Sequence, residues 1–215
     1  CNITLLCEDA MQNTEQTTQE KILCAAKAEF LEKGFQTASL RAIVKAAGVT
    51  TGALYGYYGS KEALFDALVE DCYTHFLSAY RNALDDFDRL PIEQQPERMG
   101  AVSQACMEEL LLYMFNHREA FHLLLLCSEG TRYSSMKEEL VQLEVNATHR
   151  YYLVLEKLGM PAPQIDPRLE HILVTGMINA YFEMIIHDMP LADAKQYLRE
   201  LHSFYSAGWL KIMGQ

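Results

Sequence analysis

The chain has 215 residues, of which 50% are hydrophobic and 22% charged. This composition is typical of a globular protein that can bury a sizeable core, and it excludes disorder over most of the length. The net charge of −11, taken as a single number, argues against binding to nucleic acid or to an anionic membrane surface.

The charge is unevenly distributed along the chain. Residues 17–61 contain six Lys and Arg against three Glu, a net of +3, whereas residues 1–16 carry −3 and residues 62–215 carry −11. A short basic segment therefore precedes a long acidic one. Because nucleic-acid phosphates attract basic residues, we expect residues 17–61 to be the part that meets nucleic acid, if any part does.

The cysteines and the first ten residues indicate in which cellular compartment the protein is expected to occur. The six cysteines are widely spaced and form no CxxC pair, so we predict reduced thiols that pack as small hydrophobic side chains. The first ten residues lack the basic start and the apolar run of a secretory signal. We expect a cytoplasmic protein with a flexible N-terminal extension over residues 1–16.

Helical spacing of apolar residues dominates, and no segment alternates apolar and polar residues as a strand does, so we predict an all-α fold of about nine helices. Gly34 and Gly48 are expected to end helices, and Ser39 and Ser60 to cap the starts of others. The expected helices span residues 17–33, 40–47, 51–57, a long stretch from 61, 98–116, 118–128, 134–159, 167–187 and 192–213.

The most apolar stretch, residues 172–186, is fifteen residues long and contains Glu183. We interpret it as a buried helix that is too short to cross a bilayer, and we expect no membrane partner.

Residues 37–65 carry the clearest functional signal. A helix of about eight residues, a turn containing Gly48 and a second short helix have the geometry of a helix-turn-helix. Ile43 and Leu54 are expected to pack the two helices together, with Val49 in the corner. The second helix then exposes small and hydroxyl-bearing side chains, which allow a helix to enter the major groove of DNA deeply.

These residues also follow a long spaced pattern. It comprises Ala28, Phe30, Gly34, Phe35, Ser39, Leu40, Arg41, Ile43, Ala47, Gly48, Val49, Gly52, Leu54, Tyr55, Tyr57, Tyr58, Ser60, Lys61, Glu62 and Leu64. With this pattern, residues 20–65 resemble the DNA-binding domain of TetR-family transcriptional regulators. The resemblance implies a helix-turn-helix DNA-binding domain over residues 17–62 and a helical effector-binding and dimerisation domain over residues 63–215.

The resemblance implies a role for individual residues. The helix from Thr51 is expected to read the groove, Arg41 to reach a base edge or a phosphate, and Lys61 to contact a phosphate. The predicted DNA-binding residues are Thr37, Ser39, Arg41, Thr50, Thr51, Gly52, Ala53, Tyr55, Tyr57 and Lys61. Gly56 and Gly59 depart from the family pattern, in which bulkier residues are frequent. As an alternative, Thr50, Ala53 and Gly56 are small only for internal packing.

In this family the helices corresponding to residues 98–159 enclose an apolar pocket with a few polar groups. We therefore predict a ligand site, although Met and aromatic residues at helical spacing are more often core. The predicted ligand-binding residues are Met107, Tyr113, Phe121, His122, Tyr151 and Phe182.

The last two helices are predicted to pack against their copies in a twofold dimer, as a four-helix bundle. Two DNA-binding modules about 34–36 Å apart would then read a palindrome in successive major grooves. The predicted interface residues are Val174, Met177, Ile178, Tyr181, Ile185, Tyr197, Leu201, Phe204, Tyr205 and Gly208. The alternative is that these apolar faces are buried within a single chain.

We predict a homodimeric repressor that binds a palindromic DNA operator and is released by a small, largely apolar ligand. One alternative is a helical ligand-binding or scaffold protein whose helix-turn-helix is only structural. Another is an enzyme within the acidic body, but the sequence has no GxSxG, no Gly-rich phosphate loop, and no HExxH or paired His/Cys spacing. We therefore expect no catalytic residues, no cofactor and no metal.

Overall fold

The computed structural model describes residues 17–161 and 165–212. These residues form helices and connecting loops without a strand, which confirms the all-α prediction. The α-helices are α2 (Thr18–Thr37), α3 (Leu40–Ala47), α4 (Thr51–Tyr57), α5 (Lys61–Asp88), α6 (Gln95–Asn116), α7 (Arg118–Leu126), α8 (Met136–Lys157), α9 (Pro167–Ile186) and α10 (Leu191–Ile212). Two short 3₁₀ helices, η2 (Ile92–Gln94) and η3 (Arg132–Ser135), were not predicted. The expected extension over residues 1–16 lies outside the described residues.

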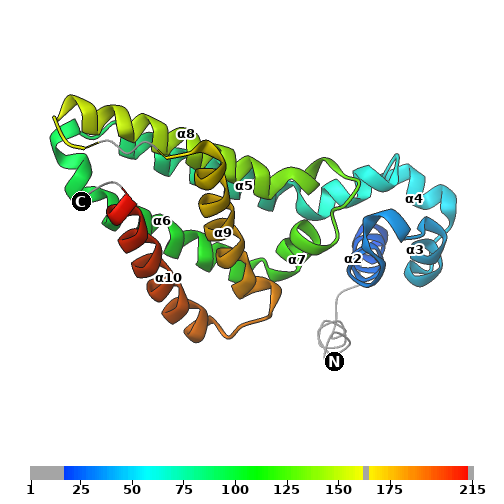
Figure 1. Ribbon diagram of the computed structural model, residues 1–215. Coiled ribbons are helices and arrows are strands. Elements are labelled where there is room, and N and C mark those ends of the chain that lie inside the picture. The colour runs from blue at the N-terminus through cyan, green and yellow to red at the C-terminus, as the bar shows by residue number, and fades with distance from the viewer. Residues whose placement is uncertain (1–16, 162–164, 213–215) are drawn as a thin grey trace.

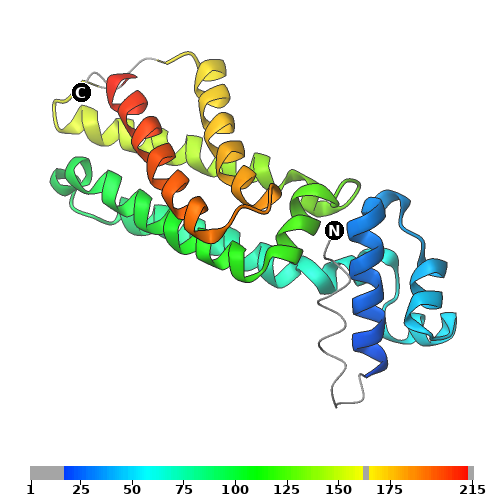
Figure 2. The same ribbon diagram turned by 90° about the horizontal axis from the view of Figure 1, so that it is seen from below.

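The helices form two groups joined by α5 (Figure 1). Helices α2, α3 and α4 cluster at one end, and α5 leads from this cluster along the length of the other helices. In Figure 2, which is seen from below, α10 crosses the near side of the body beside α9, and α7 lies between the body and α2. The long helix therefore reaches both the first cluster and the interior of the helical body.

Side-chain caps set the starts of three consecutive helices. The hydroxyl oxygens of Ser39, Thr50 and Ser60 accept hydrogen bonds from the backbone N–H groups three residues later, at 3.4, 3.1 and 3.1 Å. These N–H groups have no partner within their own helix, and a capping oxygen satisfies them. The predicted starts at residues 40, 51 and 61 are accordingly confirmed.

Helix α2 is kinked at Gly34. The regular helix stops there, and the last three residues of α2 form a separate turn. Gly34 has φ 72° and ψ 162°, outside the helical region. The N–H of Phe35 is thereby released from the helix and donates to the carbonyl oxygen of Cys127, at 2.8 Å. A kink in α2 thus creates a main-chain connection to the end of α7.

Two boundaries differ from the predictions for local reasons. Helix α6 begins at Gln95, three residues earlier than expected, with Pro96 in its first turn. Proline is favoured there because its fixed φ suits a helix and the missing N–H would have no helical partner. The residues before α8 form η3, in which Thr131 caps the N–H of Tyr133 at 3.2 Å.

The core runs from α2 into the helical body along one side of α5. Phe65, Cys72, Phe76 and Tyr80 are buried and Leu68 is half-buried, so they form an apolar stripe at helical spacing along α5. Buried residues of α2, α6, α7, α8, α9 and α10 complete the same hydrophobic cluster. Cys72 and Cys127 are buried in it, outside any disulfide, and burial raises the pKa of both thiols.

Helix α9 agrees to within one residue with the helix predicted over residues 167–187 and is longer than its fifteen-residue apolar stretch. Its 20 residues are sufficient, by length and composition alone, to cross a membrane. Within its most apolar 18-residue segment, 39% is buried inside the structure. Helices α7, α8 and α10 all pack against it. Its buried residues include Val174, Ile178 and Ile185, which lie on one side of the helix and belong to the core.

The turn between α3 and α4 makes a stability prediction possible. Gly48 has φ 66°, and a Cβ atom there would meet nothing within 4 Å, so only the left-handed backbone opposes a side chain. We expect Gly48→Ala to lower the free energy of unfolding by about 1 kcal/mol. Urea denaturation followed by circular dichroism measures this change. Gly59→Ala, at another open position without a positive φ, should leave the midpoint unchanged or slightly raised.

Candidate DNA interface and ligand cavity

Helices α3 and α4 form the helix-turn-helix. Gly48 ends α3 in a left-handed conformation, with φ 66° and ψ 30°, and the N–H of Val49 returns to the carbonyl of Val44 at 3.2 Å. Ile43 and Leu54 are fully buried between the helices, and Val49 is half-buried beside them. The turn and the packing thus agree with the geometry expected from the sequence.

The outer face of α4 projects away from the rest of the chain. Thr51 and Gly52 are exposed, and Tyr55 and Tyr57 retain 51% and 52% of their accessible surface. Ala53 is half-buried. This face therefore presents two half-exposed aromatic side chains next to small residues, and no other part of the described chain covers it.

Internal packing does not explain the glycines of α4. A Cβ atom at Gly52 would meet only the Thr50 hydroxyl, at 3.9 Å, and one at Gly56 would meet nothing within 4 Å. Glycine inside a helix is destabilising by roughly 0.5–1 kcal/mol relative to alanine. The packing explanation for Gly56 is therefore wrong. Thr50 has a local role, because its hydroxyl caps α4.

The cations of residues 17–61 are less available than their number suggests. Lys27 pairs with Glu119 and Lys33 with Glu32, each at 2.5 Å. Arg41 and Lys45 lie four residues apart on the exposed face of α3, and neither forms an ion pair within the described part of the chain. Arg41, Lys45 and, on α2, Lys21 are therefore the exposed cations of this segment that remain without an ion pair among the described residues.

The charged side chain of Lys61 binds backbone carbonyl groups at the end of α2. Its Nζ donates hydrogen bonds to the carbonyl oxygens of Phe35, Gln36 and Ala38, at 2.7, 3.1 and 3.2 Å. It also lies 4.6 Å from the centre of the Phe35 ring. An ammonium group has three hydrogens to donate, and all three have acceptors here. The prediction that Lys61 contacts a phosphate is therefore not supported by this geometry, in which Lys61 caps the end of α2.

The start of α3 differs from the expected phosphate site. The N–H of Ser39 donates to the Glu29 carboxylate at 3.0 Å, and the Thr37 hydroxyl donates to the carbonyl of Lys33. A carboxylate thus already lies where the helix N-terminus would attract an anion. Thr37 and Ser39 are exposed, but their polar groups are engaged within the chain.

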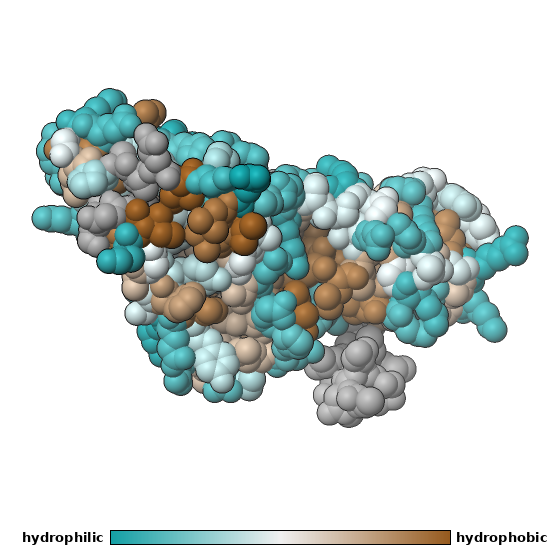
Figure 3. All heavy atoms as spheres, in the orientation of Figure 1, coloured by the Kyte–Doolittle hydropathy of each residue, from teal (hydrophilic) through white to brown (hydrophobic). Residues whose placement is uncertain are grey.

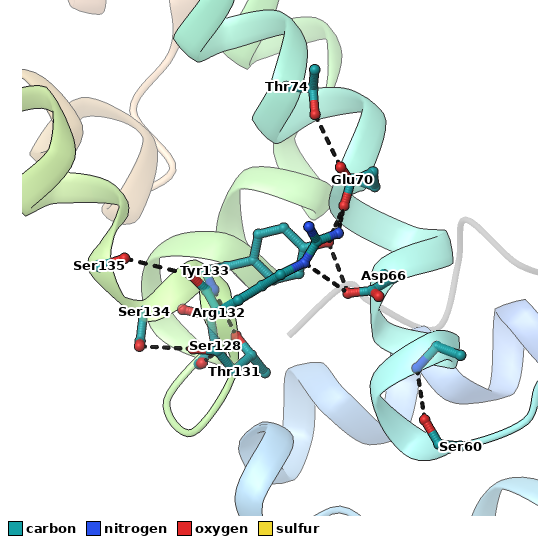
Figure 4. Close-up of polar contacts among 11 residues, drawn as sticks. Ser60, Asp66, Glu70, Thr74, Ser128, Thr131, Arg132, Tyr133, Ser134 and Ser135 are labelled. Atoms are coloured by element: carbon teal, nitrogen blue, oxygen red, sulfur yellow. Dashed lines mark hydrogen bonds and ion pairs between the residues drawn. The ribbon is translucent and has the colours of Figure 1, made fainter.

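A polar and aromatic junction connects this cluster to the helical body (Figure 4). The Tyr133 hydroxyl lies 2.8 Å from Asp66 Oδ1 and 2.5 Å from Glu70 Oε2, and Arg132 pairs with Glu70. Tyr133 is fully buried, and burial is the main cause of its strongly raised pKa, with hydrogen bonding to Asp66 second. The start of α5 is thereby fixed against η3.

A cavity of about 180 Å³ lies within the helical body. It is bordered by α5, α6, α8, α9 and α10. Its lining is mainly apolar and aromatic, with a few polar groups, as is typical of small-molecule sites. The polar groups include the Glu144 carboxylate, which accepts a hydrogen bond from Tyr80 at 2.5 Å, and the ring of His202.

Two of the six predicted ligand residues, Met107 and Tyr151, line this cavity. The other four lie outside this cavity. Phe121 and Phe182 are fully buried in the core, Tyr113 stacks on His75 with ring centres 4.0 Å apart, and His122 contacts the Ile185 carbonyl at 2.8 Å. Residue type alone does not distinguish a cavity wall from a filled core.

Glu144 was missed, although the sequence contains a signal for it. It follows Leu140 by four residues and precedes Ala147 and Tyr151 by three and seven, so a carboxylate interrupts an otherwise apolar helical face. The signal for His202 and Trp209, which face the cavity from α10, is weaker.

The predicted dimer residues divide into three groups. Val174, Ile178, Tyr181 and Ile185 retain at most 3% of their surface, so they are unavailable to a partner and their assignment was wrong. Met177, Leu201 and Tyr205 are half-buried and line the cavity. Tyr197, Phe204 and Gly208 are exposed on α10.

The exposed apolar face of the last two helices includes residues that the predicted interface did not contain. Phe204 and Ile172 retain 70% and 63% of their surface, and Leu169 retains 48%. Leu169, Ile172 and Gly176 lie on one side of α9, opposite its buried residues. Figure 3 shows hydrophobic residues gathered over α9. We call Leu169, Ile172, Gly176, Tyr197, Phe204 and Gly208 the α9–α10 face.

No cluster of three or more His, Cys, Asp or Glu side chains that could hold a metal ion occurs among the described residues.

Comparisons with known proteins match the helix-turn-helix region. The family described as "Bacterial regulatory proteins, tetR family" matches residues 22–68. The HTH-type transcriptional regulator UidR of Escherichia coli (strain K12) is 38% identical over 77 residues, which cover 36% of this chain and 39% of UidR. The HTH-type transcriptional regulator YvdT of Bacillus subtilis (strain 168) is 31% identical over 139 residues, which cover 65% of this chain and 63% of YvdT.

Residues 22–68 thus match the TetR family in sequence. The matches span less than two thirds of the length of these relatives. The fold agrees over a longer stretch. The fatty acid degradation regulator FadR from Bacillus halodurans has a TM-score of 0.53 at 16% identity, over 86% of this chain and 96% of FadR. The match to the family model ends at residue 68, within α5, whereas the 139-residue match to YvdT extends into the helical body.

The position of Lys61 predicts that its replacement lowers stability rather than selectively removing a DNA contact. We expect Lys61→Met to lower the free energy of unfolding by about 2 kcal/mol, because hydrogen bonds to a charged group are lost and three carbonyls lose their donor. Lys45→Met, at an exposed lysine of α3, should change it by less than about 0.5 kcal/mol. Thermal melts of both variants measure the difference, and equal melting temperatures would contradict this role of Lys61.

Proposed function

We propose that this chain is a cytoplasmic transcriptional regulator that binds a palindromic operator as a homodimer. It represses transcription by occupying the operator and is released when a small, largely apolar ligand enters the cavity. Residues 17–62 form the DNA-binding domain in this proposal, and residues 63–215 form the effector-binding and dimerisation domain. Its relatives are named as transcriptional regulators, and regulators of this family bind DNA and commonly act as dimers with small-molecule effectors.

The outer face of α4 carries this proposal. Gly52 and Gly56 weaken a seven-residue helix without any packing gain inside the chain. Close approach to a second surface provides a reason for them, because a helix with small side chains can lie deeper in the major groove. Arg41 and Lys45 supply positive charge beside this face, and the hydroxyls of Tyr55 and Tyr57 can reach phosphate oxygens.

The α9–α10 face supports a dimer. It presents large apolar side chains that the chain itself leaves uncovered, and monomers rarely expose large contiguous apolar patches. A twofold interface is made by the same surface on both copies. Two helix-turn-helix modules are also needed for tight binding, because one module offers only a few cationic contacts.

The position of the cavity supports release by a ligand. Helix α5 contributes Tyr80, Leu84 and Phe87 to the cavity wall and begins at the junction with the DNA-binding helices. Helix α10 contributes to both the cavity wall and the α9–α10 face. A ligand that fits one arrangement of these helices better than another will shift the separation of the two DNA-binding modules.

The scaffold alternative, in which the helix-turn-helix is only structural, leaves the glycines of α4 unexplained. A structural helix would gain stability from alanine at both positions. The enzyme alternative finds no support in the names of the relatives.

Gly52→Ala separates these alternatives. Because alanine favours the helix and nothing obstructs its methyl group, we expect stability to be retained or raised by up to about 1 kcal/mol. Affinity for DNA should fall about tenfold, since the added methyl group opposes close approach to the groove. Fluorescence anisotropy with DNA from upstream of the chain's own coding sequence measures the affinity, and thermal melting measures the stability.

Gly59→Ala serves as the matched control and should change neither quantity appreciably. Arg41→Ala should weaken binding and reduce the slope of log affinity against log salt by about one, as expected when one phosphate contact is lost. Binding that is unaffected by salt, by Gly52→Ala and by Arg41→Ala would contradict DNA recognition through this module.

The dimer is tested by placing charges on the α9–α10 face. The double variant Ile172→Glu, Phe204→Glu should be a monomer with the chain mass of 24.5 kDa, because the interface would have to bury four like charges. Leu126→Glu, on α7 at a comparable exposure of 56%, should remain a dimer. Light scattering at micromolar concentration decides the result, and a wild-type chain that is already monomeric would refute the proposed interface.

A further inference from the structure

The cavity combines aromatic walls with one carboxylate. Five of the helices contribute to it, and its aromatic side chains are Tyr80, Phe87, Tyr151, Tyr181, Tyr205 and Trp209. Among the described residues that line it, Glu144 is the acidic one and none is Lys or Arg. A buried negative charge is costly unless a positive charge compensates it. The described chain provides no such cation at the cavity wall.

Glu144 is held in position by Tyr80. The Tyr80 hydroxyl donates to Glu144 Oε2 at 2.5 Å, across the gap between α5 and α8. Glu144 keeps some accessible surface because it borders the cavity, but protein atoms surround it closely. Burial accordingly raises the pKa of Glu144, and the hydrogen bond from Tyr80 opposes this rise. The carboxylate is oriented, poorly hydrated and without a counterion.

A second polar group faces the cavity from α10. Nε2 of His202 is buried and has no hydrogen-bond partner among the described residues. Buried polar atoms are nearly always paired, so an unpaired one at a cavity wall indicates a group that a ligand can satisfy. With the proton on Nδ1, Nε2 accepts a hydrogen bond. Glu144 and His202 would then both accept N–H groups from a bound molecule.

We infer that the cavity selects a monovalent organic amine in its protonated form, with its ammonium group at Glu144 and His202 and its apolar substituents among the aromatic rings. This inference rests on the proposed function only in treating the cavity as the effector site. A cation near aromatic faces gains an additional attraction. A neutral molecule leaves the carboxylate uncompensated, and an anion is repelled by it.

The same arrangement makes binding depend on pH. Besides Glu144, the titratable groups that line the cavity are Tyr80 on α5, Cys106 on α6, Tyr151 on α8, Tyr181 on α9, and His202 and Tyr205 on α10. Burial raises the pKa of Cys106 to about 11 and those of Tyr80 and Tyr181 well above 10, so these three groups stay neutral near pH 7. A raised pKa means that Glu144 keeps its proton to a higher pH than an exposed glutamate does. Because an ammonium pairs with the ionised form of Glu144, affinity for the amine should rise with pH until Glu144 is fully ionised.

Three probes that share one carbon skeleton test this inference. Isothermal titration of the full-length wild-type chain is carried out with phenylbutylamine, phenylbutanol and phenylbutyrate. We expect the amine to bind at least about tenfold more tightly than the alcohol, and the acid to show no measurable binding. Equal affinities for the amine and the alcohol, or tighter binding of the acid, would overturn the inference.

Glu144→Gln identifies the residue responsible. Glutamine preserves an acceptor for Tyr80 but removes the charge, so the preference for the amine over the alcohol should disappear. The matched control is Glu139→Gln on the same helix, because Glu139 accepts a hydrogen bond from the Tyr73 hydroxyl at 2.8 Å outside the cavity. If Glu139→Gln reduced the preference equally, a specific role for Glu144 would be refuted. If Glu144→Gln failed to fold, the three-probe comparison on the wild type would still decide the ligand class.

Operator release is measured separately by adding each probe to the chain–DNA complex. An amine preference in titration with DNA that stays bound supports the ligand class and overturns the proposed release mechanism. DNA binding without any amine preference overturns the ligand class and leaves the DNA-binding proposal standing.

Discussion

The position of the DNA-binding helices depends on an aromatic contact at the junction of α2, α5 and η3. Phe30, Phe35 and Phe65 are buried with ring centres 5.1–5.9 Å apart, and Tyr133 continues the cluster at 6.0 Å from Phe65. Phe65 is one turn into α5, so the long helix cannot move at this end without disturbing α2. Lys61 reinforces the contact from above the Phe35 ring.

The two ends of α5 belong to different environments. Phe65 lies in the aromatic cluster, and Tyr80 lies fifteen residues later at the cavity wall, a distance of about 22 Å along a helix. Because a helix is stiff along its axis, a shift of Tyr80 is passed to the DNA-binding end as a rotation or translation of the whole element. The hydrogen bond between Tyr80 and Glu144 therefore couples the charge of the cavity to the position of α5.

Local signals in the sequence predicted local structure well. Hydroxyl caps at Ser39 and Ser60, and Gly48 after α3, defined helix boundaries because each acts within one turn. The exposed face of α4 followed from the burial of Leu54. The faces of α9 were assigned incorrectly, because a helix that is apolar on nearly all sides gives no indication of which side the chain covers. Only two of the six predicted ligand residues line the cavity. Helices that are distant in sequence place Glu144 at the cavity wall and bury Phe182 in the core, and the local sequence does not show this difference.

The hydrogen bond from the Phe35 N–H to the Cys127 carbonyl joins two main-chain atoms. Side-chain replacement at either position leaves both atoms in place, and only proline at position 35 would remove the donor. The register between α2 and α7 is thus specified by backbone geometry, with Gly34 supplying the conformation that frees the N–H. The cavity walls can accordingly diverge in sequence to suit a new ligand while the mechanical connection to the DNA-binding helices persists.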